Sequence, residues 1–256
     1  MPSLSEKLSN LRLVQGSVYA VVGLATWPGL SWVNKTEITG MENLDGLPKQ
    51  NVLFVSNHQT YFADVISFIH IFCAHLWGRK NRLGLPFYLL WPFTRVKFVA
   101  AEETMKSSFL SRVFAMAGAI TVKRTWRAEG QDVNRCRDTN DTNKIHEALN
   151  RNWVITFPQG TTKPFAPGRK GTAHIIKETK PIVVPVVING FWRAFTKRGL
   201  TFKKKGSILS IRIKEPLKID YEAPADTILE QVMEAIEQSK KYMLRGKHHL
   251  MNALDK

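Results

Sequence analysis

The sequence predicts an α/β fold: a single domain with a mixed, largely parallel central sheet and helices on both faces, preceded by an N-terminal interfacial helix. From residue 50 onwards, short apolar runs of strand length alternate with longer segments of helical periodicity. The 256 residues are 44% hydrophobic and 23% charged, which supports a large core and is unlike a disordered or fibrous chain. We therefore expect a membrane-associating segment over residues 1–40 and one folded domain over residues 41–256.

An uncharged stretch over residues 13–34 is the first candidate for contact with a membrane. Its helical pattern of apolar residues ends at Trp27 and Pro28, so it barely reaches the ~20 residues that span a bilayer. Tyr19, Trp27 and Trp32 suit the headgroup level, where aromatic side chains are enriched. We predict a helix in the membrane interface, with packing on the protein's own core as the alternative.

The elements of the domain follow from the apolar pattern. Strands are expected at residues 52–55, 96–100, 119–122, 153–157, 182–187 and 208–213. Helices are expected at residues 63–77, 108–117, 143–150, 170–178 and 226–244, the last with Asp226 as its cap. The polar run over residues 127–142 predicts a long surface loop, with a helical first half as the alternative. Strands that alternate with helices favour a sheet covered on both faces.

The chain is strongly basic, with 37 Lys and Arg against 21 Asp and Glu and a net charge of +16. Such a field attracts anions, among them anionic lipid, phosphorylated cofactors and nucleic acid, while a basic surface that serves only solubility is the alternative for each cluster. The two cysteines, Cys73 and Cys136, form no C-x-x-C pair and are predicted to be free thiols. We find no Cys and His pattern that predicts a metal site.

The segment over residues 56–64 carries the clearest chemistry, because His58 follows an apolar strand and Asp64 arrives as the next helix begins. A histidine accepts a proton near neutral pH, and a carboxylate on its other ring nitrogen fixes the tautomer and stabilises the imidazolium. The pair therefore predicts a general base with its orienting group. A strand-end histidine that makes only local hydrogen bonds is the alternative.

Two further segments end apolar strands with groups suited to anions. Residues 157–162 form a glycine-containing turn with Gln159, Gly160 and Thr161, whose backbone amides suit a phosphate or an oxyanion. Residues 118–124 end in the cations Lys123 and Arg124. Each taken singly also fits an ordinary turn or a solvated pair of cations.

In order and spacing these segments resemble the glycerolipid acyltransferases of the lysophosphatidate (1-acylglycerol-3-phosphate) acyltransferase type. Asn57 and His58 with Asp64 resemble the N-H-x4-D block, and residues 118–124 the G-x-I-F-x-x-R block. Residues 157–161 resemble the F-P-E-G-T block, and residues 181–186 the closing V-P-V block. The resemblance covers roughly residues 50 to 190.

The resemblance implies a membrane-associated O-acyltransferase with His58 as base and Asp64 as its orienter. The donor is acyl-CoA or acyl-carrier protein, the acceptor is the hydroxyl of a lysophospholipid-type lipid, and neither a further cofactor nor a metal is expected. The implied substrate-binding residues are Asn57, Lys123, Arg124, Gln159, Gly160 and Thr161. The protein is expected on the cytoplasmic face of a membrane with anionic lipid, as a peripheral or monotopic protein in phospholipid biosynthesis or remodelling.

The sequence departs from the family pattern in ways that keep a second function open. Five residues separate His58 from Asp64 where the family has four, Gln159 replaces a glutamate, and Ala101 replaces a lysine. The alternative is therefore a lipid-binding relative with altered or lost catalysis. Nucleic acid is not expected as a partner, because no helix-turn-helix, RNA-recognition or zinc-finger signature occurs.

The aromatic segment over residues 83–93 is a second candidate for membrane contact. Its apolar side chains suit an interface beside the active site where an acyl chain enters. A buried cluster between helix and sheet is the alternative.

Overall fold

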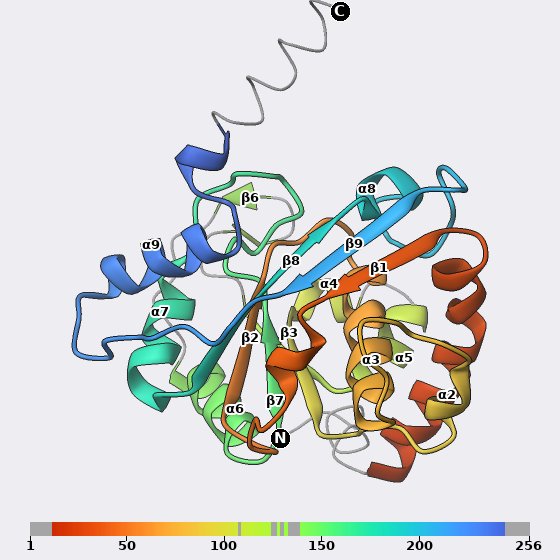
Figure 1. The fold of residues 1–256 in the computed structure, drawn as a ribbon. Coiled ribbons are helices and arrows are strands. Elements are labelled where there is room, and N and C mark those ends of the chain that lie inside the picture. The colour runs from red at the N-terminus through yellow and green to blue at the C-terminus, as the bar shows by residue number, and fades with distance from the viewer. Residues whose placement is uncertain (1–11, 107–108, 124–126, 129–130, 133–138, 244–256) are drawn as a thin grey trace, which may run out of the picture.

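A seven-stranded sheet in the order β1-β9-β8-β2-β7-β3-β4 runs through the centre of the computed structural model (Figure 1). The structure describes residues 12–106, 109–123, 127–128, 131–132 and 139–243. The strands of the sheet are β1 (Lys35–Thr39), β2 (Val52–Ser56), β3 (Val96–Ala101), β4 (Ala119–Val122), β7 (Trp153–Thr156), β8 (Ile182–Asn189) and β9 (Ile208–Ile213). A separate antiparallel pair is formed by β5 (Arg127–Ala128) and β6 (Gln131–Asp132).

The sheet is mixed and largely parallel, as predicted. Strands β8, β2, β7, β3 and β4 all run in one direction, β9 runs antiparallel to β8, and the edge strand β1 pairs parallel with β9. Six of the strands were expected from apolar runs, but β1 was not. Of the residues in β1, only Ile38 is buried. Because Lys35 and Glu37 are charged, the strand does not form the apolar run on which the prediction relied.

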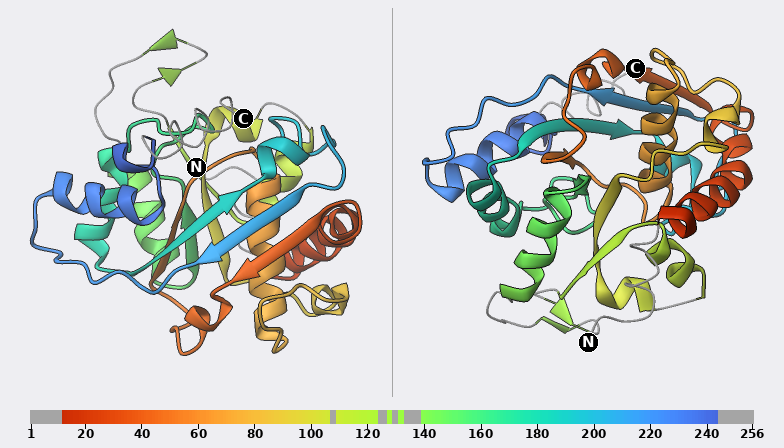
Figure 2. Two further views of the ribbon diagram at one scale, coloured as in Figure 1. Left: turned by 45° about the horizontal axis from the view of Figure 1, so that its top comes forward. Right: turned by 90° about the horizontal axis from the view of Figure 1, so that it is seen from below.

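Helices cover both faces of the sheet (Figures 1 and 2). One side carries α2 (Arg12–Ser31), α3 (Ala63–Leu76) and α5 (Phe109–Met116), and the other carries α6 (Thr139–Leu149), α7 (Lys170–Thr179) and α9 (Ala225–Ala235). Shorter helices are α4 (Glu102–Lys106), α8 (Phe191–Ala194), and the 3-10 helices η1 (Met41–Leu44) and η2 (Pro86–Leu89). The central strand β2 is buried on both sides: Val52 and Phe54 belong to one core cluster, and Leu53 and Val55 to the other. A strand covered on both faces reads as an unbroken apolar run.

Helix α2 packs against the domain through one of its faces. Gln15, Tyr19 and Trp27 are buried in contact with the core. The predicted end at Trp27 and Pro28 is wrong, because the helix continues through Pro28 to Ser31. Its last carbonyls have partners outside the helix: Asn34 Nδ2 donates to Gly29 O at 2.9 Å, and Thr36 Oγ1 donates to Leu30 O at 2.7 Å.

The last helix is shorter than predicted, since α9 ends at Ala235 and not at residue 244. Glu237 follows with a positive φ of 58°, and its carboxylate lies 2.6 Å from Arg212 Nη2 and 3.0 Å from Lys214 Nζ. These contacts to β9 and its end turn the chain out of the helix. Asp226 is not the cap, because Pro224 occupies the N-cap position and Asp226 forms an ion pair with Lys170.

The region over residues 127–142 is only partly the predicted loop. Its first half contains the antiparallel pair β5 and β6, so the helical alternative for that half is wrong. Helix α6 begins at Thr139, inside the predicted loop. Because this stretch is polar, it carries little of the apolar periodicity on which the prediction relied.

Candidate active site

His58 lies in the loop between β2 and α3, and Asp64 lies in the first turn of α3. His58 Nδ1 is 2.9 Å from Asp64 Oδ2, so the contact that the two residues were expected to make is present. Asp64 is fully buried, whereas 13% of the His58 side chain remains exposed. The carboxylate is therefore inside the protein, and part of the imidazole ring reaches the surface.

The Asp64 carboxylate also accepts hydrogen bonds from the residues between it and His58. Asp64 Oδ2 accepts the amide of Gln59 at 2.6 Å and the amide of Thr60 at 3.0 Å. Asp64 Oδ1 accepts the Thr60 hydroxyl at 2.7 Å. The loop wraps around the carboxylate, and its five intervening residues do not prevent His58 from reaching Asp64.

These contacts determine which nitrogen of His58 is free to act as a base. A carboxylate has no hydrogen to donate, so in a neutral imidazole the hydrogen bond holds the proton on Nδ1 and leaves the lone pair on Nε2. If Nε2 takes up a proton, the buried negative charge of Asp64 stabilises the imidazolium. The arrangement has the chemistry of a general base with its orienting carboxylate.

Phe157 follows β7 directly and stacks on His58, with ring centroids 4.0 Å apart and an interplanar angle of 24°. Because β7 lies next to β2 in the sheet, the stacking joins two of the strand ends that the sequence singled out. The contact restricts rotation of the imidazole ring.

Side-chain amides on both sides of His58 tie its loop to β8 and to the start of α8. Asn57 Nδ2 donates to Ile188 O at 2.8 Å, and Asn57 Oδ1 accepts Ile188 N at 2.8 Å. Gln59 Nε2 donates to Ile188 O at 3.2 Å, and Gln59 Oε1 accepts Phe191 N at 3.0 Å. The resemblance assigns Asn57 to substrate binding, but both ends of its buried amide bond to β8, so Asn57 positions the loop instead.

The turn after β7 is shaped by Gly160, which has a positive φ of 61°. Gly160 N donates to Phe157 O at 2.9 Å, and Thr161 Oγ1 accepts Lys163 N at 3.3 Å. The amide of Gly160 is therefore used inside the turn and not for the anion that the sequence suggested.

Gln159 is buried and points into the loop that follows β7. Its Nε2 donates to Ala166 O at 2.9 Å and to Gln238 Oε1 at 3.2 Å, and Gln238 Oε1 also accepts Phe165 N at 2.8 Å. A glutamate has no hydrogen for these two donations, which gives a physical reason for glutamine in this chain. The resemblance assigns Gln159 to substrate binding, whereas these contacts make it a support of residues 160–168.

Lys123 is exposed at the end of β4, and its amide donates to Asp141 Oδ2 at 2.7 Å. Strand β4 is the edge strand opposite β1, separated from β2 by β3 and β7. Arg124 lies outside the described residues, as does Cys136, so the expectation for each stays a prediction. Cys73 is a buried free thiol, and burial raises its pKa to about 12.

The aromatic segment over residues 83–93 divides between the two expected environments. Tyr88 and Leu83 are buried, whereas Phe87 and Trp91 are exposed. Phe93 packs on Trp153, the first residue of β7, whereas Phe157, which stacks on His58, follows the last residue of that strand. The segment therefore lies toward the opposite end of β7 from His58 and not beside it, where it was expected.

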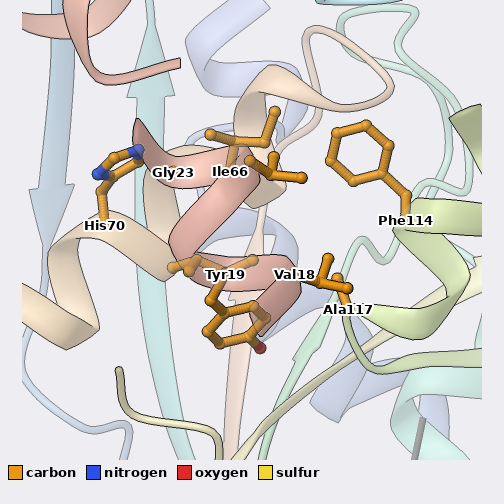
Figure 3. A pocket seen from close by; sticks show the side chains of 9 residues that line it. Val18, Tyr19, Gly23, Ile66, His70, Phe114 and Ala117 are labelled. Atoms are coloured by element: carbon orange, nitrogen blue, oxygen red, sulfur yellow. The ribbon is translucent and has the colours of Figure 1, made fainter. Parts of the chain in front are cut away.

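A small apolar cavity lies between α2, α3 and α5, where Val18, Tyr19 and Gly23 of α2 face Ile66 and His70 of α3 (Figure 3). It has a volume of only about 10 Å³, enough for about one water and not for an acyl chain. His70 is fully buried beside it, and burial lowers its pKa to about 3.

Within the described part of the chain, His, Cys, Asp and Glu do not gather in a group of three that could hold a metal ion.

Three residues have places in this site that the sequence analysis did not assign: Gln59, Thr60 and Phe157. Gln59 and Thr60 lie within the segment that carries His58 and Asp64, so their polar side chains were a local signal. The stacking of Phe157 on His58 depends on β7 and β2 being neighbours, and no local pattern shows that.

Comparisons with known proteins bear on the family and the fold of the chain. The sequence model of a family described as Acyltransferase matches residues 35–189 of the chain. Among solved structures, the 1-acyl-sn-glycerophosphate (LPA) acyltransferase PlsC from Thermotoga maritima has a similar fold, with a TM-score of 0.52 at 19% sequence identity. The similarity covers 87% of this chain and 77% of that chain. No curated protein matches the chain.

Proposed function

The chain belongs to the acyltransferase family, and we propose that it moves a fatty acyl group from acyl-CoA or acyl-carrier protein to the hydroxyl of a lysophospholipid-type acceptor. The acceptor class is suggested by the fold shared with PlsC, named as a 1-acyl-sn-glycerophosphate acyltransferase. Such a reaction belongs to phospholipid biosynthesis or remodelling. The observation that carries the proposal is the 2.9 Å contact between His58 Nδ1 and Asp64 Oδ2.

In the proposed reaction, His58 Nε2 accepts the proton of the acceptor hydroxyl while its oxygen attacks the thioester carbonyl. The two events are concerted, because a hydroxyl with a pKa near that of water, ~15.7, is not deprotonated beforehand by an imidazole. The tetrahedral intermediate then collapses, the carbon–sulfur bond breaks, and the imidazolium returns the proton to the departing thiolate. An ester and a free thiol result, and His58 is again neutral.

The acceptor's phosphate or polar head is proposed to lie on the side of His58 where β7, β3 and β4 end. Lys123 follows β4 directly, Thr161 lies in the turn that follows β7, and Arg124 follows Lys123 in the sequence. These strands run parallel to β2, so their carboxyl ends lie on the same side of the sheet as the carboxyl end of β2. Cations and hydroxyl groups at one edge suit a phosphate. Gly160 shapes the turn that carries Thr161.

The membrane contact is proposed to be made by α2 and the adjoining segment over residues 85–91. The large apolar side chains exposed there are Leu13, Val21 and Leu24 of α2, and Leu85, Phe87, Leu90 and Trp91. The two elements are neighbours, since Trp27 Nε1 donates to Gly84 O at 2.9 Å. Helix α2 is also long and apolar enough to cross a membrane by length and composition. Exposed apolar surface on adjoining elements suits a bilayer interface, and Lys7 and Arg12 favour its cytoplasmic face.

Replacement of His58 tests the proposed function. We expect His58→Ala to lower kcat by about 10²–10⁴-fold, because the general base is removed. The measurement is release of free thiol from acyl-CoA in the presence of lysophosphatidate, repeated with acyl-carrier protein as donor. His146→Ala, an exposed histidine on α6, is the matched control and keeps the wild-type rate.

The same experiment separates the enzyme from the lipid-binding alternative. A wild-type chain that binds lysolipid vesicles but releases no thiol from either donor favours the lipid-binding relative. Unchanged turnover in a folded His58→Ala variant refutes His58 as the base.

A further inference from the structure

The segment over residues 190–206, between β8 and β9, is basic and contains no acidic residue. Its six cations are all exposed: Arg193, Lys197, Arg198, Lys203, Lys204 and Lys205. In the part of the chain that the structure describes, none of these six forms a salt bridge with a carboxylate. The segment is therefore a concentration of positive charge that no carboxylate among the described residues neutralises.

The segment is held in a defined conformation. Residues Phe195 and Phe202 form an antiparallel bridge, and Thr196 N donates to Thr201 O at 3.0 Å. Lys203 N donates to Ala194 O at 2.8 Å. Residues 190–206, called the hairpin below, thus consist of α8, which carries Arg193, and a short hairpin that carries the other five cations and leads into β9 (Figure 1).

This hairpin is bonded directly to the loop that carries His58. Tyr61 N donates to Lys197 O at 3.0 Å, and Phe62 N donates to Arg198 O at 3.1 Å. Gly199 packs so closely that a Cβ there would lie 2.6 Å from Ala63 N. The segment that carries the positive charge therefore adjoins the loop of the candidate base, and Lys197 Nζ lies 5.7 Å from the centre of the Tyr61 ring in that loop.

The strand order separates this charge from the proposed acceptor site. His58 follows β2, the hairpin lies on the β8 and β9 side, and Thr161 and Lys123 lie on the β7, β3 and β4 side. A transfer between acyl-CoA and a phosphorylated lysolipid brings two anionic molecules to one histidine. Each needs cations of its own, and the sheet offers a set on either side of His58.

Given the proposed function, on which this inference rests, we propose that residues 190–206 bind the phosphorylated nucleotide end of acyl-CoA. Trp192 is exposed, and the Arg193 guanidinium lies 4.9 Å from the centre of its ring. A flat aromatic side chain beside a guanidinium suits an adenine ring and its phosphates. The apolar side chains proposed for the bilayer lie on α2 and residues 85–91, and Phe202 packs on Gly29 of α2, whereas Trp192 stands beside Arg193, which favours a nucleotide over a bilayer at that position.

The test removes three cations next to the His58 loop in the variant Arg193→Gln, Lys197→Gln and Arg198→Gln. The matched control is Lys49→Gln, Lys80→Gln and Lys218→Gln, which removes the same charge from exposed positions outside the hairpin. Binding of CoA is measured by isothermal titration calorimetry, which needs no turnover. We expect the hairpin variant to weaken CoA binding by about tenfold and the control to leave it within about twofold.

Kinetics with two thioesters complete the experiment. The KM for acyl-CoA rises by about tenfold in the hairpin variant, while kcat and the KM for the same acyl group on N-acetylcysteamine, which lacks the nucleotide, stay unchanged. Unchanged CoA affinity overturns the proposal. Loss of anionic-vesicle binding with unchanged CoA affinity assigns the hairpin to the bilayer, and selective loss of acyl-carrier-protein use assigns it to an acidic donor protein. If the wild-type chain binds CoA through the hairpin but transfers no acyl group, the proposed function fails and the nucleotide site stands.

Discussion

Asp64 holds the loop of His58 in place through hydrogen bonds that do not all require its charge. Asp64 Oδ2 accepts His58 Nδ1 and two amides, while Asp64 Oδ1 accepts only the Thr60 hydroxyl. An asparagine can place its carbonyl oxygen at the Oδ2 position and donate to Thr60, which then accepts. The geometry of the loop and the negative charge beside the imidazole are therefore separable by one substitution.

We expect Asp64→Asn to fold and to lower kcat by on the order of 10²–10³, because the imidazolium loses the charge that stabilises it. Steady-state kinetics measure the loss, and circular dichroism checks the fold. Thr60→Ser, which keeps the hydroxyl, is the control with retained activity. A wild-type kcat in Asp64→Asn would show that the carboxylate charge takes no part in proton transfer.

His70 is a buried neutral histidine that joins α2, α3 and η2. His70 Nδ1 is 2.9 Å from the Tyr88 hydroxyl, and His70 Nε2 is 3.2 Å from Thr26 Oγ1. Since Thr26 donates to Val22 O at 2.7 Å, Nε2 of His70 donates to Thr26 and Nδ1 accepts from Tyr88. Both nitrogens of the neutral ring are satisfied, and a second proton on Nδ1 would require the Tyr88 hydroxyl to reverse its hydrogen bond.

The lowered pKa of His70 predicts a loss of stability in acid. Its pKa is about 3 in the folded protein against an ordinary value of 6.5. Between these two values the unfolded chain binds a proton that the folded protein does not, so the free energy of unfolding falls as pH falls. The expected slope from this residue is at most ~1.4 kcal/mol per pH unit. Urea unfolding from about pH 6.5 down to about pH 4.5 should show a shallower slope for His70→Gln than for the wild-type chain, and equal slopes would contradict the prediction.

At the scale of the element, α2 packs on the core with one face and exposes apolar residues on the other. Gln15 Nε2 donates to Val96 O at 2.8 Å, and Tyr19 and Trp27 are buried. Val21 and Leu24 are 69% and 47% exposed. Because α2 is part of the core, its removal would disturb folding, and only its outer face can be changed without that effect.

We expect Val21→Gln with Leu24→Gln to weaken binding to anionic vesicles by about tenfold or more, because two apolar side chains no longer enter the bilayer. The thermal midpoint should stay close to that of the wild-type chain. Vesicle sedimentation and a thermal melt measure the two effects. Val21→Leu with Leu24→Ile, which keeps both positions apolar, is the control, and wild-type vesicle binding by the glutamine variant would remove α2 from the membrane contact.

At the scale of the molecule, the net charge of +16 acts together with the arrangement of the sheet. Charge at this level attracts an anionic surface before any specific contact forms. The strands β2, β7, β3, β4 and β8 are parallel, so their carboxyl ends lie together. The loops that follow these ends bring chemically different groups near one another. The positive charge of the whole molecule and the groups at the strand ends therefore both favour anionic ligands.

Membrane binding should depend on both lipid charge and salt. We expect vesicles with about 30% anionic lipid to bind the chain more tightly than neutral vesicles, and the difference to shrink as salt is raised from about 0.05 M to 0.5 M. The remaining binding at high salt reports the apolar residues of α2 and residues 85–91. Equal binding to both kinds of vesicle at low salt would contradict the electrostatic part of this proposal.

Local patterns predicted most of the elements and their order. The apolar runs of β2, β7 and β8 and the periodicity of α3 and α7 were sufficient, because burial on one or both faces leaves a direct mark on the residues of the element. The edge strand β1 and the end of α9 were not predicted. Their boundaries depend on pairing with β9 and on the contacts of Glu237 with Arg212 and Lys214, which are distant in sequence.

The sequence by itself determined the α/β class and the acyltransferase family resemblance, and it predicted His58 and Asp64 as a contacting pair, because residue type and spacing are local properties. Only the tertiary structure decided which polar groups face the site. It placed Asn57 against β8, Gln159 inside its own loop and the hairpin over residues 190–206 beside the His58 loop. A side chain bonds to whatever the fold brings within about 3 Å of it, and strand order and loop path are properties of the whole packed chain.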